Sequence, residues 1–331
     1  MTPPPLHGTK LHQIATRFIL AFLCRGAGAA TAAPGDGSQA GASRQELRID
    51  SPLELQVELH RRGFSCGAID GVAGAQTSAA LSAFQRGAGI AETGVLDSPT
   101  RERLRPSTPA LGSHTFTAIE LAGLHPVAGT WLEKSQAATL GYASALDLAA
   151  ERFHSDPNLI RRLNPAVNWD AVLPGTTIVV PAVDEVVVSG TAAQILITMG
   201  THELEVLDAE DRVIAHFPVS IARMVEKRPV GGLKVTVVIP NPDYTFDPDL
   251  FPESEEGRAL GRKLVIPPGP RNPVGLAWIG LDRPGYGIHG TPEPENVGRT
   301  ESHGCFRLAN WDVLTLVGLV RVGLPVNVLW E

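Results

Sequence analysis

Apolar residues stand three and four positions apart over much of residues 51–105, which is the spacing of amphipathic helices. Leu55 and Leu59 follow Ser51-Pro52, a dipeptide that favours a helix start because Ser caps the first turn and Pro is tolerated there. We therefore predict a small all-α three-helix bundle, whose limited core would be only marginally stable alone. Its helices are expected to start at Ser51-Pro52, Gln76 and Ser98-Pro99 and to end at Gly63, Arg86 and Leu104.

A second ordered stretch, residues 113–183, is predicted to mix helix and strand. Residues 143–153 and 158–163 have helical spacing, and an apolar strand follows at residues 178–181. Between the N-terminal region and the three-helix bundle, residues 33–50 are rich in Gly, Ala, Ser and polar residues, so we predict a linker there.

From residue 186 the pattern changes to short apolar runs separated by turn signals, which is typical of a sandwich or barrel-like β domain. A helix over residues 311–322 and a strand over 326–330 close this region. We predict a mainly-β sandwich over residues 186–331. Its other strands are expected at residues 186–188, 194–197, 204–207, 213–215, 234–239 and 277–281.

The composition limits the class of protein. Of the 331 residues, 43% are apolar and 19% are charged, which is typical of a folded globular chain and not of a disordered one. The net charge is −7, and all of this excess lies in residues 184–331, which hold 13 basic and 20 acidic residues. Nucleic acid is excluded as the main partner, because phosphate binding needs clustered Lys and Arg.

The N-terminus has the layout of a secretory signal peptide. Lys10 and Arg17 precede a seven-residue apolar run over residues 18–24, and small residues follow with the choice Ala30-Thr31-Ala32 for cleavage. We predict a signal peptide over residues 1–32 and export to the periplasm or cell envelope; the alternative is a disordered, Ala-rich tail. No run approaches the ~18 apolar residues that a membrane helix needs, so no membrane span is expected.

Cysteine usage excludes a disulfide framework, because the chain holds only Cys24, Cys66 and Cys305. Cys24 falls within the predicted signal peptide, and Cys66 is interpreted as a free structural thiol. Cys305 is the candidate nucleophile, since it lies beside glycine in Ser302-His303-Gly304-Cys305-Phe306-Arg307.

A nucleophilic cysteine needs a base that takes its proton and backbone donors that stabilise an oxyanion. Two histidines are available: His303 is two positions before Cys305, and His289 is sixteen positions before it. Spacing alone does not choose between them. A buried thiol beside a satisfied imidazole is the alternative to catalysis. A structural zinc site is disfavoured, because these three side chains give too few ligands at the wrong spacing. No metal or organic cofactor is expected.

The full set of motifs resembles the catalytic domain of YkuD-type L,D-transpeptidases. The resemblance rests on His289-Gly290-Thr291, on residues 302–307, and on upstream pieces, and covers about residues 186–330. The upstream pieces are Asn272-Pro273-Val274-Gly275, Trp278, Gly280-Leu281 and Tyr286-Gly287-Ile288.

Two further resemblances concern the residues before this domain. Arg62-Gly63-Phe64, Ile69-Asp70-Gly71 and Phe84-Gln85 resemble the three-helix peptidoglycan-binding domain; the alternative is a generic helical bundle. Residues 113–183, with Asn164-Pro165 and Leu173-Pro174-Gly175 before the last strand, resemble the second half of a LysM carbohydrate-binding module. The alternative there is a spacer that binds no ligand.

The family resemblance implies a role for each residue of the site. Cys305 would be the nucleophile and His289 the general base, with the Gly290 carbonyl orienting the imidazole. His303 would support the ion pair or the incoming amine, and Gly304 and Cys305 would supply oxyanion donors. Ser302 would fix the loop. Arg307 would hold a substrate carboxylate, or else pair with a nearby acid, and Tyr286 would line the acyl pocket, or else pack in the core.

The resemblance implies an exported peptidoglycan L,D-transpeptidase. It would cleave the bond between the stem-peptide diamino acid and D-Ala, and transfer the acyl group to an amine of another stem or of an envelope protein. An L,D-carboxypeptidase that uses water, and a non-catalytic wall-binding protein, are the alternatives. Residues 227–232 depart from the family's usual Thr-Pro-x-Gly turn, because Arg228 replaces the hydroxyl residue. The insertion at residues 241–270, rich in Pro and acids, is expected to form a flap.

Overall fold

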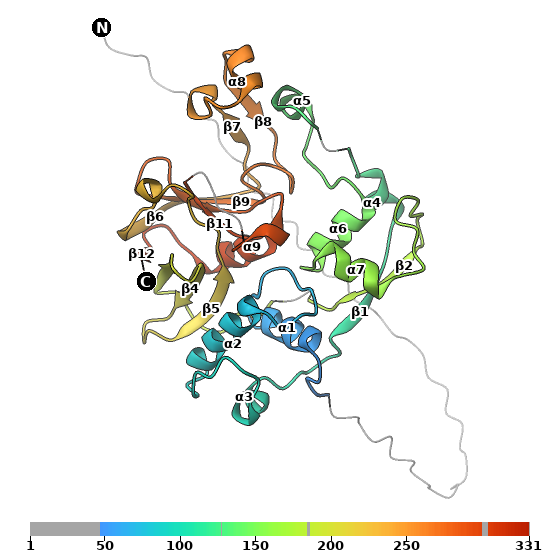
Figure 1. The fold of residues 1–331 in the computed structure, drawn as a ribbon, viewed down its shortest axis with the longest axis vertical. Coiled ribbons are helices and arrows are strands. Elements are labelled where there is room, and N and C mark those ends of the chain that lie inside the picture. The colour runs from blue at the N-terminus through green and yellow to red at the C-terminus, as the bar shows by residue number, and fades with distance from the viewer. Residues whose placement is uncertain (1–46, 127, 184–185, 300–303, 331) are drawn as a thin grey trace, which may run out of the picture. The chain divides into compact units, whose positions relative to one another are not determined.

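Three helices form the first part of the computed structural model, which describes residues 47–126, 128–183, 186–299 and 304–330 (Figure 1). The predicted signal peptide, most of the predicted linker, Cys24, Ser302 and His303 lie outside the described residues. A capping box starts the first helix: the Ser51 hydroxyl accepts from the Glu54 amide, and the Glu54 carboxylate accepts from the Ser51 amide. The helices are α1 (Pro52–Arg61), α2 (Ala75–Gly87) and α3 (Ser98–Arg103).

The core of this three-helix unit is shared with the β domain. Leu59, Leu81 and Phe84 are buried in it, and Leu207 and Val213 from the C-terminal sheet belong to the same cluster. Sharing explains how so small a bundle is stabilised, since its own apolar surface is limited.

The next part, which we call the mixed segment (residues 111–181), places two helices on a strand pair. Its first and last strands, β1 (Leu111–Thr115) and β2 (Thr177–Pro181), pair antiparallel. Helices α6 (Ala145–Arg152) and α7 (Pro157–Leu163) bury an apolar face that includes Ile160 against Ile178 of β2. Two short helices, α4 (Ala118–Ala122) and α5 (Trp131–Gln136), come between β1 and α6.

The C-terminal part is an eight-stranded sheet in the order β11-β10-β9-β6-β12-β3-β4-β5. Neighbouring strands are antiparallel except the pairs β12–β3 and β10–β11, which are parallel. The ten-residue β6 pairs with β12 at its start and with β9 at its end, and the register shifts between Val235 and Val237. The strands are β3 (Gln194–Thr198), β4 (Glu203–Leu207), β5 (Val213–Pro218), β6 (Gly231–Pro240), β9 (Ala277–Leu281), β10 (Gly287–His289), β11 (Phe306–Arg307) and β12 (Pro325–Leu329).

This sheet curls so that its two ends enclose one core. Ile197 and Leu204 from one end share a buried cluster with Ile279 and Ile288 from the other, and Val313 of helix α9 (Asn310–Leu319) joins them. Figure 1 shows α9 lying beside β9 and β11. The predicted mainly-β sandwich is confirmed, with one curled sheet supplying both layers.

Two element predictions are wrong in this region. Residues 186–188 form no strand, because the backbone there turns to the end of α1, where the Val187 amide donates to the Arg61 carbonyl at 2.8 Å. The last helix ends at Leu319 rather than at residue 322, since Val320 is already extended. Short 3₁₀ turns occur at Val225–Lys227, Pro248–Leu250 and Pro294–Asn296.

The hairpin insertion (residues 241–270) packs against the mixed segment. Its strands β7 (Tyr244–Phe246) and β8 (Leu264–Ile266) pair antiparallel, with helix α8 (Glu255–Leu260) between them. The Trp131 ring of α5 stacks on Phe246 with centroids 4.3 Å apart. The Glu256 carboxylate accepts from the amides of Trp131 at 2.9 Å and Leu132 at 2.8 Å, so it caps the start of α5. Leu140, Phe246, Leu264 and Ile266 are buried in this joint cluster.

Candidate active site

Strands β10 and β11 bring the two motif regions together at the edge of the sheet. They pair in parallel, with Ile288 opposite Phe306 and His289 opposite Arg307. Cys305 lies in the bend immediately before β11, so the register places it beside Gly287, on the strand that carries His289. The Cys305 thiol donates to the Gly285 carbonyl with an Sγ–O distance of 3.5 Å.

His289 is held in one orientation by two neighbours, the Gly290 carbonyl and the Trp278 ring. It is only 7% exposed, and its Nδ1 lies 2.6 Å from the Gly290 carbonyl oxygen. The ring stacks on Trp278 with centroids 5.6 Å apart. Because a carbonyl can only accept, Nδ1 carries the proton, and Nε2 is the nitrogen that can take one.

The electrostatics of His289 and Cys305 describe a neutral pair at rest. Burial lowers the pKa of His289 to about 4, opposed by the hydrogen bond to Gly290 and assisted by the charge of Arg307. Burial raises the pKa of the Cys305 thiol, opposed by a backbone hydrogen bond at Gly287. A neutral imidazole and a protonated thiol on neighbouring chain segments favour proton transfer during attack over a preformed ion pair.

The other predicted site residues take varied positions. Gly304 is half-buried next to Cys305, and the space where a Cβ would stand is open. Arg307 is half-buried, and its backbone pairs with Ser220 through two 2.9 Å hydrogen bonds. Burial lowers the pKa of Arg307, while Glu293 raises it. Tyr286 is half-buried near the tip of the β9–β10 hairpin, with the Arg283 guanidinium 4.6 Å from its ring centroid.

Sequence reasoning missed two residues near this site, Tyr244 and Asn310. Burial raises the pKa of Tyr244, in the hairpin insertion, to about 12, and the charge of the Cys305 thiolate raises it further. Asn310 begins α9, and its Oδ1 accepts from the Leu276 amide at 3.0 Å. Neither position had a usable signal, because an insertion has no periodicity and an Asn at a helix start is common.

The described cysteines, Cys66 and Cys305, are not joined to each other by a disulfide. Cys66 is buried in the three-helix core, and burial raises its pKa, as expected for an inert structural thiol. Within the ranges that the structure describes, no group of three His, Cys, Asp or Glu side chains is arranged to hold a metal ion.

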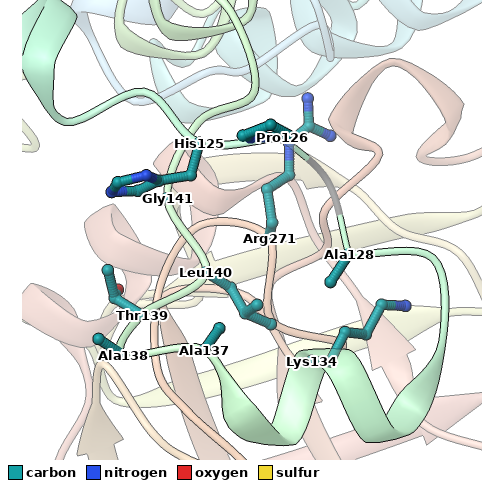
Figure 2. Close-up of a pocket in the computed structure, with 10 residues that line it drawn as sticks. All are labelled: His125, Pro126, Ala128, Lys134, Ala137, Ala138, Thr139, Leu140, Gly141 and Arg271. Carbon is teal, nitrogen blue, oxygen red and sulfur yellow. The ribbon is translucent and has the colours of Figure 1, made fainter.

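A separate cavity of about 270 Å³ lies in the mixed segment beside Arg271, and neither Cys305 nor His289 lines it. Figure 2 shows the Arg271 side chain extending toward Pro126. The residues that line this cavity are His125, Pro126, Ala128, Lys134, Ala137, Ala138, Thr139, Leu140, Gly141 and Arg271.

Comparison with known proteins decides the family. Residues 192–328 match the family model described as "L,D-transpeptidase catalytic domain", and residues 50–104 match the one described as "Putative peptidoglycan binding domain". The Bacillus subtilis (strain 168) protein named "Putative L,D-transpeptidase YqjB" is 33% identical over 138 residues, which are 40% of this chain and 68% of that protein. The chain belongs to the L,D-transpeptidase family.

Other members of the L,D-transpeptidase family align over comparable stretches. The Escherichia coli (strain K12) protein named "Probable L,D-transpeptidase YbiS" is 29% identical over 58% of this chain and 62% of its own length. Among solved structures, the L,D-transpeptidase from Mycobacterium smegmatis is 18% identical with a TM-score of 0.33, covering 48% of this chain and 70% of that one. The Ldtfm-avibactam carbamoyl enzyme is 20% identical with a TM-score of 0.31, over 49% of this chain and 55% of its own.

Both the L,D-transpeptidase resemblance and the peptidoglycan-binding resemblance are thus confirmed. The resemblance of residues 113–183 to a LysM module stays a prediction; in the structure the described residues of this segment form four helices, α4 to α7, between the antiparallel strands β1 and β2. The roles of individual site residues, and the exact limits of the domains, are proposals.

Proposed function

We propose that this chain is an exported peptidoglycan L,D-transpeptidase in which Cys305 is the nucleophile and His289 the general base. The observation that carries the proposal is the register of β10 and β11, which sets Cys305 beside the strand of His289. The Nδ1 of His289 is committed to the Gly290 carbonyl at 2.6 Å, so Nε2 is the nitrogen that would accept the thiol proton. Family membership supports an enzyme that acts on peptidoglycan.

In the acylation step, His289 takes the Cys305 proton as the sulfur attacks the carbonyl carbon of the diamino acid at its bond to D-Ala. The carbonyl π electrons move to oxygen, and the amides of Gly304 and Cys305 stabilise that oxyanion. The intermediate collapses, the C–N bond breaks, and His289 returns the proton to the departing D-Ala amine. A thioester on Cys305 remains.

In the transfer step, an amine from a second stem peptide or an envelope protein attacks the thioester carbonyl. His289 accepts a proton from this amine and delivers it to the departing thiolate, which restores the starting state. The product from a second stem is a 3→3 cross-link. No metal or organic cofactor enters either step.

Substrate contacts are proposed for residues that surround this pair. The guanidinium of Arg307, next to His289 across the strand pair, would hold a substrate carboxylate in a bidentate fork. Tyr286 would line the acyl pocket, while Ser302 would fix the loop and His303 would support the incoming amine. Tyr244 would add a wall of the pocket, since the charge of the Cys305 thiolate acts on its pKa.

The remaining parts of the chain would keep the enzyme at its substrate. An enzyme that acts on peptidoglycan works outside the cytoplasm, and we propose that residues 1–32 direct export to the periplasm or cell envelope. The three-helix unit, and residues 113–183 if they bind glycan, would raise the local concentration of stem peptides. Over the described ranges, the structure contains no helix with the length and apolar character of a bilayer span.

The test is incubation of the purified protein with a disaccharide tetrapeptide, read by mass spectrometry. Cross-linked dimers with released D-Ala would support transpeptidation, and free tripeptide without dimers would show the L,D-carboxypeptidase reaction instead. No D-Ala release, together with no acylation of Cys305 by a carbapenem-type probe, would leave a non-catalytic wall-binding protein. The Cys305→Ala variant is expected to lose D-Ala release and keep sacculus binding; loss of both would contradict separate binding and catalytic parts.

A further inference from the structure

The side chain of Asn310 is fixed by three hydrogen bonds. Asn310 is 1% exposed at the start of α9, and its Oδ1 accepts from the Leu276 amide at 3.0 Å. Its Nδ2 donates to the Pro270 carbonyl at 3.1 Å and to Oε1 of Glu151 at 2.5 Å. These partners distinguish the oxygen from the nitrogen of the amide, so they allow one orientation of it.

Asn310 in turn supports the peptide that orients His289. Its Oδ1 lies directly against the Cα atoms of Gly275 and Gly290, since a Cβ built on either glycine would collide with that oxygen. The carbonyl of Gly290 is the acceptor for Nδ1 of His289. A rotation of the Asn310 amide would therefore change the contact that holds the Gly290 peptide, and with it the hydrogen bond of the imidazole.

Glu151 reaches this arrangement from another part of the chain. It lies on α6 of the mixed segment, outside residues 192–328 that match the catalytic family, and is 6% exposed. Burial raises its pKa to about 8, so at neutral pH it is mostly a protonated acid whose Oε1 accepts from Asn310. A side chain that cannot accept at this position would leave one Nδ2 hydrogen of Asn310 without a buried partner.

A second contact from helix α6 supports the chain segments next to Gly275 and Gly290. The Arg271 guanidinium pairs with the Asp147 carboxylate of α6, with Nε 3.0 Å from Oδ2, and also donates to the Pro292 carbonyl. Residues 271 and 292 flank Gly275 and Gly290, so α6 supports both segments on which Asn310 rests.

We propose that Glu151 is a positioning residue for His289, acting through Asn310 and the Gly290 peptide, so that α6 of the mixed segment is part of the support of the active site. The inference rests on the proposed role of His289 as general base.

The test compares Glu151→Leu and Glu151→Gln in the protein without the predicted signal peptide (residues 1–32). Acylation of Cys305 by a carbapenem-type probe is measured across the pH range in which imidazole and thiol titrate. Glu151→Leu is expected to slow acylation about tenfold, as for the loss of one buried hydrogen bond. It should also shift the acidic side of the pH–rate profile to lower pH. The Gly290 hydrogen bond raises the His289 pKa against the effect of burial, so weakening that bond lowers this pKa. Glu151→Gln keeps an acceptor oxygen, so it should show most of the wild-type acylation rate and the wild-type pH–rate profile.

The matched control is Glu58→Leu, which makes the same change at a glutamate that is 4% exposed on α1 and pairs with Arg61 and Arg62. It should lower stability without moving the pH profile. Asn310→Ala, alone and combined with Glu151→Leu, completes a double-mutant cycle. Cys305 acylation should be no slower in the double variant than in Asn310→Ala alone. Additive losses, or a Glu151→Leu variant whose only change is stability, would overturn the proposal.

The pKa of His289 is also measured directly by NMR titration of its ring in the wild type and in Glu151→Leu. A wild type that fails to acylate would count against the proposed function, whereas this titration still decides the positioning role. An unchanged His289 pKa in Glu151→Leu would refute that role.

Discussion

The Gly290 carbonyl oxygen accepts a 2.6 Å hydrogen bond from Nδ1 of His289, the residue just before it in the sequence. In many hydrolases a carboxylate takes this orienting position next to the base and stabilises its charged form. A peptide carbonyl orients the ring without a full charge, so burial dominates and the His289 pKa falls to about 4. The base is therefore available at mildly acidic pH.

Loss of the His289 base should slow acylation strongly. We expect His289→Ala to lower the rate of Cys305 acylation by about 10²–10⁴-fold, the range for removal of a general base. The rate is measured by mass spectrometry of the probe adduct, with circular dichroism confirming the fold. A loss below about tenfold would assign the base role to another group, with His303 the first candidate.

Addition of one methyl group at Gly290 should have a similar consequence for activity. Gly290→Ala places a Cβ against Asn310 Oδ1, so we expect acylation to fall at least tenfold and the free energy of unfolding to drop by about 1–3 kcal/mol. Gly318→Ala on α9 is the control, because its Cβ meets nothing within 4 Å and Ala favours helix by up to about 1 kcal/mol. Equal stabilities for the two variants in urea unfolding would contradict the tight packing of Gly290.

Stability should pass through a maximum near neutral pH. Burial lowers the pKa of His60, His216 and His289 to about 4, so these groups stabilise the folded state above the pKa of an unfolded histidine and lose that effect as pH falls toward 4. Each contributes up to about 1.4 kcal/mol per pH unit in that window. Glu151 has the opposite sign, because its raised pKa of about 8 makes its contribution fall as the pH rises from the pKa of an unfolded glutamate toward 8.

Urea unfolding from mildly acidic to mildly alkaline pH measures this curve. If the free energy of unfolding kept rising as the pH fell below the pKa of an unfolded histidine, these histidines would not be buried in their neutral form. The His216→Gln variant should lose less stability on the acidic side of this curve, by the contribution of one histidine.

The contact between Trp131 and Phe246 should control the stability of the hairpin insertion. Trp131→Ala removes the ring that stacks on Phe246, so we expect a loss of about 2 kcal/mol, below the range for a fully buried Trp. Limited proteolysis should then cut within residues 247–263 sooner than in the wild type. Trp330→Ala is the control, since Trp330 is 45% exposed, and the contact of the Arg228 guanidinium with its ring is worth about 1 kcal/mol or less. Identical proteolysis of both variants would argue against the contact.

The sequence predicts those parts of the fold whose residues carry local signals. Ser51-Pro52 and the Leu55–Leu59 spacing identify α1, and Asp156-Pro157 starts α7, because caps and periodicity act over a few residues. The β1 strand escapes prediction because most of Leu111–Thr115 is exposed and it pairs with a strand more than sixty residues away. Residues 186–188 have the composition of a strand, and a long-range hydrogen bond to the end of α1 overrides it.

The residues of the candidate site also fall into those that local motifs reveal and those that only the folded structure reveals. Cys305, His289 and Gly290 could be found from motifs, because their roles depend on chemistry within one or two short stretches. Glu151 lies more than 150 residues before Asn310, which it contacts, and no local pattern connects them. Its role depends on the packing of α6 beside α9, which only the folded chain specifies.

The shared cluster of Phe246, Leu264 and Ile266 with Leu140 has a consequence for how this protein can be divided. The part that matches the catalytic family begins at residue 192, yet Leu140 and Trp131, which cover these apolar side chains, lie before that point. A fragment cut at the family boundary would expose them to water and would also lose Glu151. The region that matches the catalytic family is thus smaller than the region that packs together, and a truncated protein should begin before Trp131.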